Sequence, residues 1–147
     1  MRRIALVLST VLVAACAKPE TPPAADMPAA PSINLADLTG TWSSVTTAPG
    51  SDSILVTSTI IASADPLAWM IILPGRDTMP FNVSVSGDSL ITGAGPYESV
   101  LRPGTQVSTT GVLRLVNGQL TGPMVAHYVT AGADSTLNLF TTATKAP

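Results

Sequence analysis

The sequence predicts an all-β domain, an up-and-down antiparallel barrel of about eight strands. From Leu35 to Pro147, short runs rich in Val, Ile and Thr follow one another and are separated by turn residues. No segment with a helical period is longer than a turn. Closing a meander of strands removes its exposed edges, which favours a barrel over the alternative, a two-sheet β-sandwich.

Each expected element has a local signal. Leu35–Leu38 suits one helical turn, and the best alternation is that of Phe81, Val83 and Val85 with polar residues between them. Asn117-Gly118 between two alternating runs predicts a tight hairpin, and Pro123 predicts a bulge or a locally unpaired position. We expect strands at residues 40–47, 53–63, 68–73, 81–85, 89–93, 106–116, 119–129 and 137–143.

The N-terminal residues have the composition of a secretory signal. Arg2 and Arg3 precede an apolar run, residues 4–13, that is shorter than the roughly 20 residues needed to span a bilayer. Its length suits the apolar region of a signal peptide, and small residues follow it. We therefore expect residues 1–15 to be removed.

Val13-Ala14-Ala15-Cys16 resembles the lipobox of bacterial lipoproteins. That resemblance implies that Cys16 is lipidated and that several acyl chains then hold the protein at a membrane. Ala17, where an Asp commonly retains such proteins at the inner membrane, implies the periplasmic leaflet of the outer membrane of the cell envelope. The alternatives are an ordinary signal peptide with a chance cysteine, or an N-terminal helix.

The remaining composition restricts both architecture and function. Residues 16–34 are rich in Pro and Ala and predict an extended tether, followed by one domain at residues 35–147. Without Arg2 and Arg3 the chain has five basic and nine acidic residues, a net charge of −4, and its arginines are scattered. This pattern argues against nucleic-acid binding. We expect no cofactor, and Cys16 is the only cysteine.

Gly40-Thr41-Trp42, after the short helical turn, resembles the opening motif of lipocalins and related small barrels. The resemblance implies that Trp42 closes one end of the barrel, that Gly40 allows close approach there, and that Lys145 covers the Trp. Residues 95–102 and Ala126-His127-Tyr128 are also similar to segments of small bacterial lipoproteins with a lipocalin-like domain. That likeness implies no activity.

The loop at residues 95–104 combines polar and aromatic side chains more densely than any other part of the domain. One hypothesis makes it the rim of a ligand site, with Tyr97 stacking on a ligand and Glu98, Ser99 or Arg102 fixing a polar group. The other is structural: a Glu98–Arg102 pair braces the loop and Tyr97 packs across a barrel end.

His127 is the only histidine, and it alternates with Tyr128 between the faces of one strand. It is a further candidate for ligand contact, although a histidine among apolar neighbours is more often structural. With no second histidine or free thiol, a metal site lacks ligands. No nucleophile motif supports a triad with Ser99 and Glu98, so we do not expect an enzyme.

Two functional hypotheses remain. The first is a lipid-anchored barrel that binds an apolar or amphipathic small ligand on a face that includes Trp69, Ile71, Val83 and Val85. The second is a structural or adaptor protein that presents a solid barrel to another envelope protein.

Overall fold

The computed structural model describes residues 32–130 and 135–147 of the chain. The predicted signal peptide, Cys16 and all but the last three residues of the predicted tether therefore lie outside the described residues. Among the residues described, no helix has the length and apolar character needed to cross a membrane.

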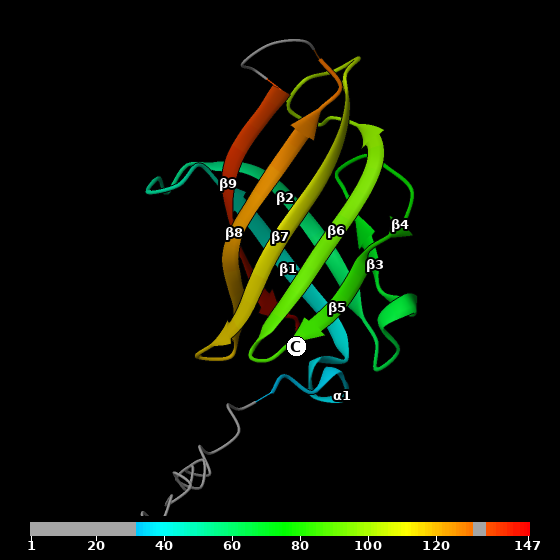
Figure 1. The fold of residues 1–147 in the computed structure, drawn as a ribbon, viewed down its shortest axis with the longest axis vertical. Helices are drawn as coiled ribbons and strands as arrows, with labels where there is room; N and C mark the ends of the chain where they lie inside the picture. The colour runs from blue at the N-terminus through cyan, green and yellow to red at the C-terminus, as the bar shows by residue number, and fades with distance from the viewer. Residues whose placement is uncertain (1–31, 131–134) are drawn as a thin grey trace, which may run out of the picture.

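The described chain folds into nine antiparallel strands in one nearly closed up-and-down barrel, as Figure 1 shows. Apart from strands it has two short helical elements, α1 (Leu35–Leu38) and the 3₁₀ turn η1 (Pro66–Ala68). The strands are β1 (Gly40–Thr47), β2 (Ile54–Ala62), β3 (Met70–Ile72), β4 (Met79–Pro80), β5 (Asn82–Ser86), β6 (Ser89–Glu98), β7 (Gln106–Val116), β8 (Gln119–Tyr128) and β9 (Thr136–Lys145).

The strand order β4-β3-β2-β1-β9-β8-β7-β6-β5 confirms the predicted barrel and excludes the sandwich. Because β1 pairs with both β2 and β9, the first and last strands lie side by side. The predicted fourth strand, residues 81–85, corresponds to β5, which pairs with β6. The structure adds the two-residue strand β4 just before it, which pairs with β3. Phe81 donates its backbone N–H to Trp69 O at 2.9 Å, so this segment almost completes the ring.

The predicted turn chemistry is confirmed at two positions. Asn117 and Gly118 both have positive φ, 51° and 78°, as a two-residue hairpin of this kind requires. At Pro123 the β7–β8 pairing is interrupted without a change of register, so the position is locally unpaired rather than bulged. Proline has no N–H to give to the ladder.

The two ends of the barrel differ. The Trp42 end is the end where α1 and the β5–β6 and β7–β8 hairpins lie, and the Tyr97 end is the end where β6 and β8 finish and the loop after β6 lies (Figure 1). The main hydrophobic core occupies the Trp42 end and is built on large buried side chains: Leu38, Trp42, Trp69, Phe81, Leu90, Leu113 and Leu120. A smaller cluster of Val107, Ala126, Tyr128 and Leu139 is separate from it, and Tyr97 packs against both.

Two expectations are corrected by the structure. The strand expected at residues 89–93 extends to Glu98, because the chain continues past Gly93 through an irregularity in the β6–β7 ladder. Val85, expected on the ligand face, is 41% exposed, because it lies at the end of β5, next to the hairpin that joins β5 to β6.

Candidate functional site

A register shift in β6 places Tyr97 toward the interior. Leu90, Thr92 and Ala94 are buried in strict alternation, and the β6–β7 register then shifts between Ala94 and Tyr97. An extra residue in one strand reverses which side chains face inward. After the shift Tyr97 is half-buried and Ser99 is buried, whereas Glu98 is exposed.

The loop between β6 and β7 is held by its own hydrogen bonds. Ser99 Oγ accepts from the backbone N–H groups of Leu101 and Arg102 at 3.1 and 3.0 Å, and Ser99 N–H donates to Thr105 O at 2.8 Å. Glu98 Oε1 accepts from Gly104 N–H at 2.9 Å. The loop is therefore a compact cover over the Tyr97 end, with Leu101 directed into the barrel.

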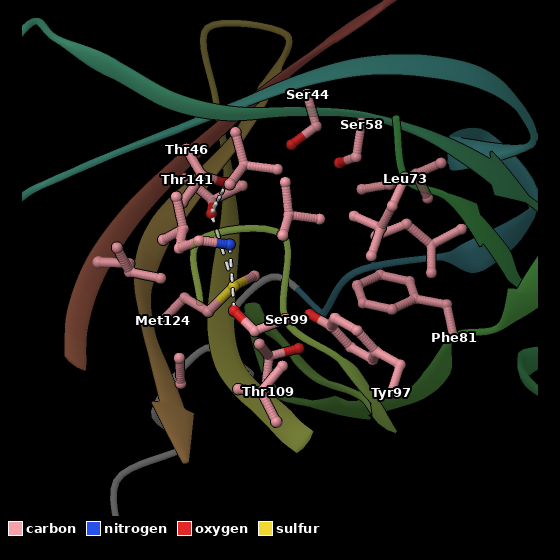
Figure 2. Close-up of a pocket in the computed structure, with 18 of the residues that line it drawn as sticks. Ser44, Thr46, Ser58, Leu73, Phe81, Tyr97, Ser99, Thr109, Met124 and Thr141 are labelled. Atoms are coloured by element: carbon pink, nitrogen blue, oxygen red, sulfur yellow. Dashed lines mark hydrogen bonds between the residues drawn. The ribbon is translucent and has the colours of Figure 1, made fainter. Parts of the chain in front are cut away.

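Beneath this cover is an interior cavity of about 60 Å³ (Figure 2). It lies where the two hydrophobic clusters meet, and its apolar walls include members of both. Those walls are formed mainly by Ile60, Ile71, Leu73, Phe81, Leu113 and Leu139. Its polar walls carry the hydroxyl groups of Ser44, Thr46, Ser58, Ser99, Thr109 and Thr141.

Four of these hydroxyl groups, those of Ser58, Ser44, Thr46 and Thr141, form a band across β2, β1 and β9. Ser44 faces Ser58 across the β1–β2 ladder, and Thr46 faces Thr141 across the β1–β9 ladder. Thr46 and Thr141 share a hydrogen bond of 3.0 Å, and Thr141 also donates to Met124 Sδ at 3.8 Å.

Ser44 and Ser58 are different from this threonine pair. Figure 2 shows their hydroxyl groups pointing into the cavity, and neither bonds to another of the lining residues drawn there. Ser44 is only 1% exposed. A hydroxyl group on a cavity wall can both donate and accept a hydrogen bond, so this pair is suited to bind a polar atom of a molecule in the cavity.

The pKa of Tyr97 is shifted because its side chain lies on the cavity wall. Burial raises the pKa of its phenol above the ordinary value of 10.0, while a side-chain hydrogen bond with Thr109 and the charge of Arg76 act in the opposite direction. Tyr97 is therefore a neutral hydrogen-bonding group at physiological pH, and the Arg76 guanidinium lies near enough to act on it.

The structure brings together Tyr97 and Ser99, which both line the cavity. Glu98 is directed away to Gly104, and the Arg102 guanidinium lies 4.0 Å from the centroid of the Tyr128 ring, where it covers that buried side chain from outside. His127 is exposed on the outer wall, and its Nε2 lies 3.3 Å from Thr110 Oγ1. His127 is thus outside the cavity, as its alternation with Tyr128 requires.

Gly40 and Trp42 lie at the opposite end. Trp42 is 2% exposed, and its Nε1–H donates to Leu38 O at 2.8 Å. Lys145 Nζ lies 5.7 Å from the Trp42 ring centroid, the arrangement that the resemblance to lipocalins implies. Gly40 has φ 130°, and a Cβ there would come within 3.1 Å of Lys145 Cε.

Sequence reasoning missed the hydroxyl band. The sequence did contain an indication of it: Ser44 and Thr46 lie two and four residues after Trp42 on β1, so all three side chains share the inward face of that strand. Polar residues on a buried face of a strand point to a cavity or a hydrogen-bonded network. Among the described residues, no group of three or more His, Cys, Asp or Glu side chains could hold a metal ion.

Comparisons with protein-family models, with curated proteins and with solved structures found no match for this chain. The site must therefore be interpreted from its own geometry.

Proposed function

We propose that this protein is a lipid-anchored envelope lipoprotein whose lipocalin-like barrel binds a small amphipathic ligand. The ligand-binding part of this proposal is supported by the interior cavity, which has hydroxyl groups on one wall and aliphatic and aromatic side chains on the others. Binding sites for small molecules combine a largely apolar lining with a few directed polar groups in this way. We propose no catalytic role for these residues.

The size of the cavity limits what can be enclosed. At about 10–15 Å³ for each water-sized sphere, 60 Å³ takes the equivalent of about four to six such spheres. Typical pockets for drug-sized ligands are several times larger, roughly 300–1,000 Å³. The enclosed part of the ligand is therefore a short aliphatic group with one polar atom, not a long acyl chain or a sterol.

The test uses linear alcohols from ethanol to hexanol and the ¹³C-methyl NMR signal of Met124, which lines the cavity. We expect saturable shifts of that signal, and Ser44→Ala should weaken binding by about fivefold, the value of one hydrogen bond. Ser84→Ala, an exposed serine on β5, is the matched control. If no alcohol moves the Met124 signal, the ligand-binding proposal is wrong.

The anchor is supported by the lipobox-like Val13-Ala14-Ala15-Cys16 alone. We expect the full chain, expressed in a bacterium that processes lipoproteins, to fractionate with membranes and to carry acyl chains on Cys16. Cys16→Ser should release it from the membrane fraction, whereas Ser9→Ala within the same signal run should not. An unmodified Cys16 in the mature protein would exclude the anchor.

A second candidate function, an adaptor, is favoured by one observation on the outer wall. Ile91 and Val112 face each other across β6 and β7, and Pro123 and Phe140 face each other across β8 and β9. The three large side chains of this apolar stripe are 37–41% exposed. Apolar stripes of this kind are found at protein interfaces.

Phe140→Ser should abolish co-purification of an envelope protein if the stripe binds one, and should leave alcohol binding unchanged.

A further inference from the structure

The barrel wall has a break beside the hydroxyl band. β3 pairs with β2 at only three positions, Thr59, Ile60 and Ile61, and the chain then leaves the sheet in a turn closed by Arg76 N–H donating to Leu73 O at 3.1 Å. The part of β2 from residue 54 to residue 58 therefore has no β3 neighbour. On the far side of this break, β5 pairs with β6 only as far as Gly93.

A groove of about 580 Å³ lies on the outer surface over this break. Its floor includes Thr57 and Thr59 of β2, and the turn after β3 forms its wall with Gly75, Arg76 and Asp77. Ser58 and Leu73 line both this groove and the interior cavity. The two spaces thus share these two residues, which lie between the cavity and the groove.

A ligand would reach the cavity less easily through the Tyr97 end of the barrel. There the loop after β6 covers the cavity with Ser99, Val100 and Leu101. The loop is braced by the hydrogen bonds of Ser99 and Glu98, and Arg102 lies over Tyr128. Opening this end would require several of these contacts to break together, whereas β2 and the chain after β3 are not paired beyond Thr59 and Ile72.

We infer that the site is bipartite: the ligand enters laterally between β2 and the turn after β3, and its larger part stays in the outer groove. This inference rests on the proposed ligand-binding function. Ser58 lines both spaces, and Ser44, its partner across the β1–β2 ladder, lines the cavity beside it.

This arrangement defines the ligand class. A tail of about four to six non-hydrogen atoms fills the cavity. An amide, ester or hydroxyl group behind it bonds to Ser44 and Ser58. A larger polar head occupies the groove beside Arg76 and Asp77, which present one charge of each sign. The ligand is thus a short-chain acyl or alkyl derivative of a polar molecule rather than a free lipid.

The test uses 4-butanamido-TEMPO, which joins a four-carbon acyl tail and an amide to a paramagnetic ring too large for the cavity. Bound to the full chain, its ring should broaden the amide NMR signals of Thr57 and Gly75 in the groove more strongly than those of Val100 and Gly104. The tail should shift the Met124 methyl signal at the same time. 4-Hydroxy-TEMPO, which lacks the tail, is the control for non-specific contact.

The outcomes are distinguishable. Broadening centred on Val100 and Gly104 with a shifted Met124 signal would overturn lateral entry and leave ligand binding intact. No tail-dependent effect on Met124 while the linear alcohols still shift it would overturn the bipartite site and leave ligand binding intact, whereas no effect of either would overturn both. As a matched pair, Leu73→Ala should raise the exchange rate of the probe by about tenfold, a barrier change of about 1.4 kcal/mol. Glu98→Ala, which removes a hydrogen bond from the covering loop without changing the cavity lining, should leave it unchanged, and the reverse pattern would also overturn lateral entry.

Discussion

Individual residues decide which side chains reach the cavity, and Gly95 is the clearest case. It has φ 110°, and a Cβ there would lie 2.8 Å from Val107 O and 2.9 Å from Ser108 Cα. Only glycine tolerates both the conformation and the approach. Gly95 therefore lets β6 remain close to β7 while its register shifts, which turns Tyr97 inward.

We expect Gly95→Ala to lower the free energy of unfolding by about 2–4 kcal/mol, because backbone strain and steric overlap would both destabilise the folded state. Gly104→Ala is the matched control: its φ is also positive, 80°, but nothing lies within 4 Å of the added Cβ. It should cost only about 1–2 kcal/mol. Urea unfolding of the two variants measures the difference, and equal losses would contradict this account.

Tyr97 also gives the barrel a dependence on alkaline pH. Its pKa is raised in the folded state above the ordinary value of 10.0, chiefly by burial. Between the unfolded and folded pKa values the folded chain keeps a proton that the unfolded chain has lost. The stabilisation is therefore complete below pH 10 and declines as pH rises above it.

We expect Tyr97→Phe to remove this contribution. The difference in unfolding free energy between the original chain and the variant should be constant up to about pH 9 and should change in favour of the variant above about pH 10. Denaturant titrations at a series of pH values measure it. Parallel curves across the whole range would show that the phenol does not titrate differently in the two states.

At the scale of elements, α1 depends on the strand that follows it. Four residues are too few to form a helix alone. It is held by Asn34, whose side chain accepts from Ala36 N–H at 3.1 Å, by burial of Leu38, and by the bond from Trp42 to Leu38 O. The turn and Trp42 thus close the barrel as one unit.

Trp42→Phe should lower the free energy of unfolding by about 1–3 kcal/mol, because the buried Leu38 carbonyl group loses its donor. Lys145→Met removes the exposed cation above the ring and its hydrogen bond to Asp37 O, and should cost less, about 0.5–1 kcal/mol. Thermal unfolding compares the two. A larger loss for Lys145→Met would mean that the lysine, rather than the indole hydrogen bond, holds this end together.

For the whole molecule, most of the fold could be predicted from local signals. The turn at residues 35–38, the strands at 40–47 and 106–116 and the Asn117-Gly118 hairpin agree with the structure because alternation and turn chemistry are local properties. The register shift in β6 could not be predicted. It depends on the contact of Gly95 with β7, a neighbour that is assigned only when the sheet forms.

The candidate site was predictable only in part. Tyr97 and Ser99 were selected as members of a polar loop, and both line the cavity. Ser44, Ser58 and Thr141 lie far apart in the chain, and each is an ordinary strand residue until the barrel brings them together. The lateral break likewise depends on how few residues of β3 pair with β2, a length that no local pattern determines.

The pairing of β1 with β9 has a consequence for engineering. Ala146 N–H donates to Thr41 O at 2.8 Å, so the two ends of the barrel sequence are in contact. A short linker could join them, and new termini could be opened at Pro49-Gly50, between β1 and β2. Such a circular permutant would keep every strand pair but have its termini near the Tyr97 end. Attached to a solid support through those termini, the barrel would present its Trp42 end, rather than its Tyr97 end, to the solution.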